Sequence, residues 1–139
     1  ILTSVTPEGH EFARQRVRTP DRTAWFPFDA PSCVRRAYEA FAPAFVVLCE
    51  VELWPNHLRE ARARGIPVFV VNGRLSERDA RNYRMGGRFI RNVFALPDLV
   101  CARSEEDAAR FSGLGARNVV VSGDMKFDPL PCTAAGPKG

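Results

Sequence analysis

Strand-like and helix-like segments alternate along the whole of this 139-residue chain, and that alternation is the strongest constraint on its fold. Short runs of β-branched and aromatic residues predict six strands, over 1–5, 23–27, 45–49, 67–71, 99–102 and 119–122. Longer segments predict helices over 6–18, 32–41, 55–64, 77–95 and 105–114. Because parallel strands need long crossovers between them, this order predicts an α/β fold with a Rossmann-like, doubly wound parallel sheet.

The helix boundaries follow from capping residues. Serine is a favoured N-cap because its hydroxyl accepts a backbone N–H from the first turn. The sequence predicts three such caps, at Ser32, Ser76 and Ser104. Gly65 suits the left-handed residue that follows a helix, and Gly86 with Gly87 predicts a break or kink within the segment 77–95.

The length of the chain allows one domain with a core of its own. We expect that domain over residues 1–130 and a linker over 131–139, where proline, glycine and alanine are frequent. The chain starts at Ile1, directly in an apolar segment, and we expect it to be a piece of a longer protein. No apolar run reaches the ~20 residues that span a bilayer, and four widely spaced cysteines fit a reducing, cytoplasmic setting.

The apolar run 45–49 stops at two carboxylates, Glu50 and Glu52, just before Trp54 and Pro55. A continuous run of this kind predicts a strand that is buried on both faces, as in parallel sheets. Pro55 suits the first turn of a helix, so both acids lie between a strand end and a helix start. Ligands bind at that edge of open α/β sheets, although acids placed there also stabilise a helix N-terminus without any further role.

Polar residues also follow other predicted strands, and in a parallel sheet all of them would rise at the same edge. They include Thr6, Arg74, Ser76 and Lys126. Glu50 and Lys126 are then candidates to face each other, with Lys126 binding a ligand phosphate or only pairing with Glu50. Neither a G-x-G-x-x-G motif nor a P-loop follows a strand, which disfavours dinucleotide binding, and two isolated histidines predict no metal site.

Arginines are concentrated in the segment 78–91, at positions 78, 81, 84, 88 and 91. If one helix continued through Gly86 and Gly87, Arg81, Arg84, Arg88 and Arg91 would form a stripe beside aromatic residues. The stripe and the formal net charge of +4 suit anionic lipid headgroups or a phosphorylated saccharide, because arginine offers a bidentate fork to phosphate. A solvated helix face is the alternative.

Six segments match the pattern of one known family in order and spacing: 3–9, 26–31, 50–56, 72–78, 104–111 and 123–128. They resemble the 3-deoxy-D-manno-octulosonic acid (Kdo) transferases of Gram-negative lipopolysaccharide synthesis. The resemblance covers nearly the whole chain up to Leu130. The sequence departs from the usual family pattern at Val51, Gly73 and Asp79, and these changes remove no carboxylate or lysine.

The resemblance implies the amino-terminal, acceptor-binding half of a GT-B glycosyltransferase at the cytoplasmic face of the inner membrane. Such an enzyme moves Kdo from CMP-Kdo to the lipid A precursor without a metal or another cofactor. By matching position, Glu50 and Lys126 would stabilise the transition state. The residues expected to bind the acceptor are Thr6, Glu52, Arg74, Ser76, Arg78, Arg81, Arg84 and Arg88. The family's general base and its CMP-Kdo domain would lie outside this chain, so we expect no transfer by the chain alone.

Two other functions are compatible with the composition. A stand-alone α/β module for a nucleotide or another anionic ligand should carry a glycine-rich phosphate loop, which this sequence lacks. A nucleic-acid-binding domain is indicated only by the positive charge, and no nucleic-acid motif supports it. We therefore expect no nucleic-acid partner.

Overall fold

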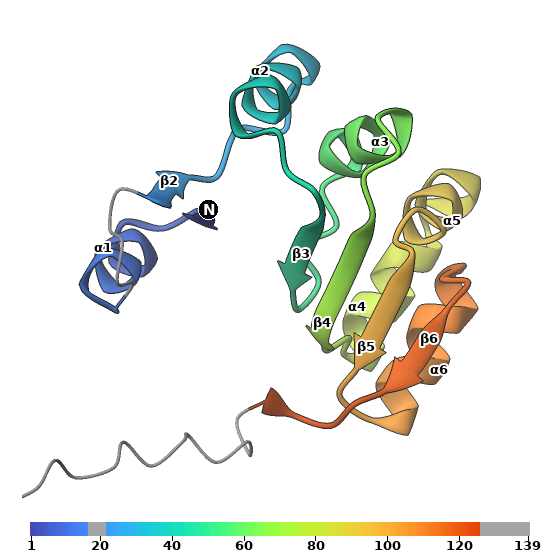
Figure 1. Cartoon of the computed structure of the whole chain (residues 1–139). Helices are drawn as coiled ribbons and strands as arrows, with labels where there is room; N and C mark the ends of the chain where they lie inside the picture. Colours follow the sequence, from blue (N-terminus) through green and yellow to red (C-terminus); the bar gives the residue numbers. More distant parts are fainter. Residues whose placement is uncertain (17–21, 126–139) are drawn as a thin grey trace, which may run out of the picture. The chain divides into compact units, whose positions relative to one another are not determined.

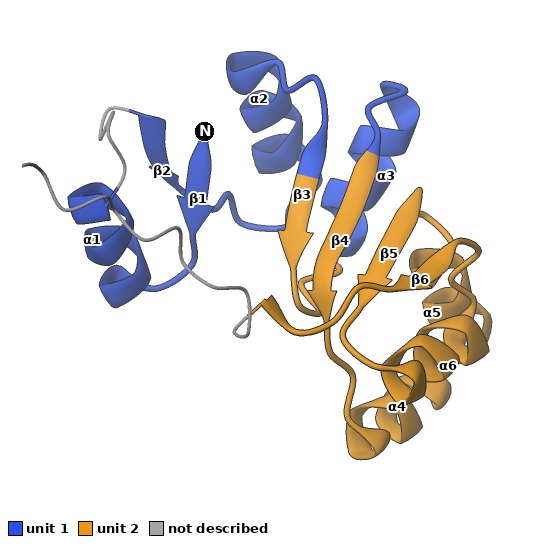
Figure 2. Ribbon diagram, turned by 60° about the horizontal axis from the view of Figure 1, so that its bottom comes forward, with its two compact units in different colours: residues 1–46, 54–67 blue, residues 47–53, 68–139 orange. Residues whose placement is uncertain are grey.

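The computed structural model describes residues 1–16 and 22–125 and has an α/β fold with parallel strand pairs (Figure 1). The elements in chain order are β1 (Leu2–Ser4), α1 (Pro7–Arg16), β2 (Thr23–Trp25), α2 (Pro31–Phe41), β3 (Val46–Cys49), α3 (Pro55–Ala63), β4 (Val68–Gly73), α4 (Glu77–Arg84), α5 (Gly87–Phe94), β5 (Leu99–Ala102), α6 (Glu105–Leu114) and β6 (Val119–Val121). The chain divides into two compact units, coloured separately in Figure 2. None of the helices in the described part has the length and apolar character of a membrane span.

Unit 1 comprises residues 1–46 and 54–67. Strands β1 and β2 pair in parallel, with Leu2 opposite Thr23. Helices α2 and α3 pack on each other. Their buried residues are Val34, Tyr38, His57, Leu58 and Ala61. The core of this unit therefore lies mainly between the two helices.

The Asp29 carboxylate caps α3 from a distant part of the chain. Its Oδ1 accepts the backbone N–H groups of Asn56 at 3.1 Å and of His57 at 3.0 Å. Asn56 returns the contact, because its Nδ2 donates to the Asp29 carbonyl oxygen at 2.7 Å. First-turn N–H groups have no acceptor within the helix, and the indole of the preceding Trp54 only donates. Asp29 therefore ties the segment before α2 to the start of α3.

His57 is buried among aromatic side chains of unit 1. Its ring centroid lies 4.4 Å from that of Phe26 and 5.8 Å from that of Tyr38, and its Nε2 lies 3.3 Å from the Pro27 carbonyl oxygen. Burial lowers the pKa of His57, and the Pro27 carbonyl and the Asp29 carboxylate oppose this effect only in part. The folded chain therefore favours the neutral ring.

Acid should destabilise the fold through His57. An unfolded histidine takes up a proton near pH ~6.5, whereas the folded state resists it, so the folded chain binds fewer protons in this range. The stability from the neutral ring is full above pH ~6.5 and is lost as the pH falls toward the lowered folded-state pKa. Urea unfolding in a pH series should show this decline, and His57→Gln should flatten it. An unchanged pH dependence in the variant would assign the effect to another group.

Unit 2 comprises residues 47–53 and 68–139. Its strands follow the order β3-β4-β5-β6, and the register places Phe69 opposite Leu99 and Val100 opposite Val119. Helices α4, α5 and α6 lie on one side of the sheet (Figure 2), as right-handed crossovers between strands in sequence order require. The largest fully buried side chains here are Val70, Leu75, Phe94, Val100 and Phe111.

The α/β class and the parallel pairing are confirmed, but the sheet differs from the prediction. The six strands form a two-stranded and a four-stranded sheet instead of one sheet. The prediction that β3 is buried on both faces is also wrong, because Leu48 is 6% exposed while Val47 is 48% exposed. Strand β3 is the first strand of its sheet, and successive side chains point to opposite faces. An apolar run predicts a strand, but it does not predict which strands pair with it or which of its faces are covered.

Most predicted helix boundaries are confirmed. Ser76 and Ser104 accept a first-turn N–H and cap α4 and α6. Ser32 does not cap α2, which begins one residue earlier, because Pro31 has the fixed φ and missing N–H that suit the first helical position. The break at Gly86 and Gly87 is confirmed, since α4 and α5 are separate helices and Gly87 has φ of +54°.

Candidate functional site

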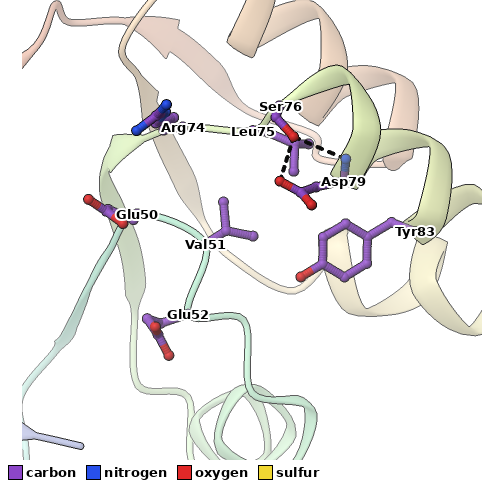
Figure 3. Close-up of a pocket in the computed structure, with 8 residues that line it drawn as sticks. All are labelled: Glu50, Val51, Glu52, Arg74, Leu75, Ser76, Asp79 and Tyr83. Carbon is purple, nitrogen blue, oxygen red and sulfur yellow. Dashed lines mark hydrogen bonds between the residues drawn. The ribbon is translucent and has the colours of Figure 1, made fainter. Parts of the chain in front are cut away.

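A polar cavity of about 300 Å³ opens in unit 2 at the carboxyl ends of β3 and β4 (Figure 3). We call it the carboxylate cavity. Its lining residues are Glu50, Val51, Glu52, Arg74, Leu75, Ser76, Asp79 and Tyr83. Three carboxylates and one guanidinium give this lining a net negative charge, so it suits hydroxyl or ammonium groups that donate hydrogen bonds to carboxylates.

Glu50 lies where β3 ends and has φ of +61°, a conformation that few residues other than glycine adopt. Its N–H donates to the Val71 carbonyl oxygen at 3.0 Å, which extends the pairing with β4 to this residue. Asn72 in β4 has φ of +52°, and its Oδ1 accepts the N–H of Met125 at 3.3 Å. Left-handed residues thus occupy two neighbouring strand ends, as is common at ligand sites.

Ser76 and Asp79 form a reciprocal pair at the start of α4. Ser76 Oγ accepts the backbone N–H of Asp79 at 3.1 Å and donates to Asp79 Oδ2 at 2.5 Å. Figure 3 shows the pair at the cavity wall. Because both contacts belong to the helix cap, this part of the wall has a defined geometry.

Tyr83 lies one turn further along α4, and its hydroxyl is directed toward the loop that carries Val51 and Glu52 (Figure 3). Burial and the carboxylates of Asp79 and Glu52 raise the pKa of Tyr83. The phenol therefore stays protonated at neutral pH, and it can donate a hydrogen bond to a ligand in the cavity.

A second cavity, of about 310 Å³, lies among α4, α5 and α6. We call it the arginine cavity, and its lining residues are Tyr83, Arg84, Gly87, Arg88, Ile90, Arg91, Gly113 and Leu114. Within the described residues, Arg84, Arg88 and Arg91 have no ion-pair partner. Three such guanidinium groups beside apolar side chains suit an anion, above all one with phosphate geometry.

The structure brings four predicted site residues together, because Glu50, Glu52, Arg74 and Ser76 all line the carboxylate cavity. The arginine stripe depended on one continuous helix, and that condition is not met because the helix breaks at Gly86 and Gly87. Its members separate: Arg84, Arg88 and Arg91 line the arginine cavity, whereas Arg81 pairs with Glu77 at 3.2 Å. Arg78 is exposed on α4 and lines neither cavity.

Two predicted residues lie elsewhere. Thr6 belongs to unit 1, where its Oγ1 accepts the N–H of Gly9 at 3.1 Å at the start of α1. Lys126 lies outside the described residues, so its position opposite Glu50 stays a prediction. Among the residues that are described, no group of His, Cys, Asp and Glu side chains is placed to hold a metal ion.

Sequence reasoning missed two polar residues of the carboxylate cavity, Asp79 and Tyr83. In the sequence, Asp79 stands out only as a departure from the family pattern. Tyr83 is one of the aromatic residues beside the arginines. A signal for both was present, because Ser76, Asp79 and Tyr83 are spaced i, i+3 and i+7 and so share one helix face. Because Ser76 is predicted at a strand end, the same spacing predicts Asp79 and Tyr83 near that strand end as well.

Parallel strands with a polar cavity at their carboxyl ends are the arrangement in which domains of the α/β class typically bind ligands. The sequence model of the family described as 3-deoxy-D-manno-octulosonic-acid transferase (kdotransferase) matches residues 1–129. This chain belongs to that family of Kdo transferases, which are glycosyltransferases.

Several curated relatives share the family name. The 3-deoxy-D-manno-octulosonic acid transferase of Bordetella pertussis is 40% identical over 105 residues, which are 76% of this chain and 24% of the relative. That of Chlamydophila psittaci is 30% identical over 129 residues, with 91% and 30% covered, and that of Aquifex aeolicus is 26% identical over 127 residues, with 91% and 33% covered. The chain thus spans between 24% and 33% of the length of these relatives.

Proposed function

We propose that this chain is the amino-terminal, acceptor-binding part of a GT-B glycosyltransferase that moves Kdo from CMP-Kdo to the lipid A precursor. The family match over residues 1–129 carries the proposal, and the carboxylate cavity at the strand ends supports it. In the proposed enzyme, the general base and the CMP-Kdo domain come from parts of the protein outside this chain. Its proposed location is the cytoplasmic face of the inner membrane of a Gram-negative cell.

Glu50 and Lys126 are the proposed catalytic residues. Transfer of a keto sugar builds positive charge on the sugar ring while negative charge leaves with the CMP phosphate. A fixed carboxylate can stabilise the first charge and a fixed ammonium the second. The hydrogen bond from the Glu50 N–H to β4 holds its backbone at the strand end, beside the carboxylate cavity. Neither residue is assigned the role of general base.

The proposed acceptor places different groups in the two cavities. Saccharide hydroxyls fit the carboxylate cavity, where Glu52 accepts hydrogen bonds and Tyr83 donates one. A phosphate there would meet three carboxylates, whereas the arginine cavity offers it three guanidinium groups. Thr6, Arg78 and Arg81 stay predictions of further acceptor contacts.

The transfer reaction tests this function. With CMP-Kdo and lipid A precursor, the full-length parent protein should form a Kdo-bearing product that mass spectrometry detects by its added mass. This chain alone should form none, because donor, acceptor and base cannot be brought together by one half of the site. Turnover by the chain alone would contradict the proposal that the donor-binding domain and the general base lie outside it. Failure of the full-length protein, with phosphate still bound by this chain, would favour an anionic-ligand-binding module.

Replacing Arg88 and Arg91 together by Gln in the full-length protein should raise the KM for the lipid acceptor about tenfold or more at low salt. Each such arginine contributes on the order of 1 kcal/mol of attraction toward an anionic surface, and salt screens that attraction. The kcat should change little, because the arginine cavity holds no residue assigned to bond making. Steady-state kinetics and co-sedimentation with anionic vesicles in a salt series measure both effects.

The matched control for this pair is Arg35→Gln with Arg36→Gln, two exposed arginines of α2. It removes the same charge outside both cavities, so it should leave the acceptor KM nearly unchanged. Equal effects of the two pairs would reduce the arginine cavity to a generally basic surface. If neither double variant changed the acceptor KM, the arginines of the cavity would only be solvated and would not contact the acceptor.

A further inference from the structure

Asp107 carries a buried carboxylate that links two strand-end loops of unit 2. The residue is 4% exposed and lies in the first turn of α6. Its Oδ2 accepts the hydroxyl of Ser104 at 3.1 Å, and its backbone N–H donates to the same hydroxyl at 3.2 Å, which completes the cap of its own helix. Its Oδ1 accepts the backbone N–H of Leu75 at 2.8 Å, from the loop between β4 and α4. One carboxylate thus serves two loops.

Arg110 contacts the backbone carbonyl of Leu75, the residue whose N–H donates to Asp107. Its Nη1 donates to the Leu75 carbonyl oxygen at 3.1 Å and lies 3.4 Å from Asp107 Oδ1. The Leu75 side chain is 1% exposed and is anchored in the core. Leu75 is therefore fixed by its N–H, its C=O and its side chain. Its neighbours Arg74 and Ser76 both line the carboxylate cavity.

Arg103 extends the network to a third strand end. Its backbone N–H donates to the Gly73 carbonyl oxygen at 3.0 Å, and its Nε lies 3.9 Å from Asp107 Oδ2. Its Nη1 donates to Asp124 Oδ2 at 3.1 Å. The loops after β4, β5 and β6 are thereby joined through side chains of the segment 103–110.

We infer that Asp107, with Arg110, is a positioning residue that holds Arg74 and Ser76 in place for the acceptor. The inference rests on the proposed function for its substrate, but the contacts that carry it are independent of that function. A buried carboxylate with four hydrogen-bonding or ionic contacts defines its surroundings strongly, because leaving any partner unsatisfied is unfavourable. Small displacements of a binding wall weaken ligand interactions steeply.

The test uses Asp107→Asn in the full-length parent, with two readouts. Hydrogen–deuterium exchange should rise in the peptide that contains residues 73–76 and stay unchanged in the one that contains Val70. The KM for the lipid acceptor should rise about tenfold, as expected for loss of one charge-assisted hydrogen bond, while the KM for CMP-Kdo stays unchanged. A merely structural role would affect both KM values together.

Glu105→Gln is the matched control, because Glu105 is exposed in the same turn of α6 and carries the same charge. It should leave both readouts unchanged. Arg110→Gln is the second variant, since it removes the contact to the Leu75 carbonyl and keeps the helix cap; a smaller rise in the acceptor KM, about threefold, is expected.

The two readouts separate failure of the inference from failure of the proposed function. Unchanged exchange over 73–76 in both variants would overturn the inference, whatever the enzyme does. Raised exchange with an unchanged acceptor KM in an active enzyme would also overturn it, because the loop would then not serve the acceptor. A parent that transfers no Kdo would refute the proposed function, while raised exchange confined to 73–76 would still support Asp107 as the positioning residue of the cavity wall.

Discussion

Glu50→Gln in the full-length parent is expected to lower kcat by about a hundredfold, the loss typical of removing one preorganised electrostatic group. Glutamine keeps the shape of the side chain and one accepting oxygen, and it removes the negative charge together with the second accepting oxygen. The reason for a large effect is the placement of Glu50 at the end of β3, where the backbone is held against β4 and the side chain lines the carboxylate cavity. Initial rates at saturating CMP-Kdo and acceptor measure kcat directly.

The matched control is Glu105→Gln, which removes the same charge from an exposed position at the start of α6. Its kcat should equal that of the parent. If a folded Glu50→Gln protein retained nearly normal kcat, Glu50 would be left with the ordinary role of an acid before a helix N-terminus.

Asp29→Ala should lower the free energy of unfolding by about 3 kcal/mol, the largest stability effect that we expect from a single substitution outside the apolar core. The variant leaves the N–H groups of Asn56 and His57 without their carboxylate acceptor at a part-buried helix start. It also removes the negative charge that complements the helix dipole of α3. Urea unfolding at neutral pH, followed by circular dichroism, measures the change.

Asp29→Asn separates these two contributions. Its amide oxygen still accepts one N–H, so its loss should be about 1 kcal/mol and should reflect mainly the missing charge. Equal stability of Asp29→Ala and the parent would show that water replaces the carboxylate as the acceptor for α3.

Local chemistry made much of this structure predictable. The hydroxyls of Ser76 and Ser104 cap their helices because serine competes well for first-turn N–H groups, and Gly87 breaks the helix because it takes a positive φ. The rule that parallel strands present their following loops at one edge placed Glu50 and Arg74 in the same cavity.

Longer-range features were not predictable from these patterns. Strand periodicity does not say which strands are neighbours, so the division into two sheets and the exposure of Val47 were missed. The caps supplied by Asp29 and the contact of Asp107 with Leu75 join residues 27 to 32 positions apart. Such contacts form only when the elements pack together, so no local sequence pattern predicts them.

Tyr83 lines both cavities, and this shared wall has a thermodynamic consequence. A ligand group that shifts the ring while entering one cavity changes the shape offered by the other. Linkage then requires that the effect be mutual: whatever a phosphate in the arginine cavity does to saccharide affinity, the saccharide does to phosphate affinity by the same factor. An acceptor that carries both groups on one scaffold would experience this coupling within a single binding event, so its two halves, offered as separate molecules, would not reproduce its affinity.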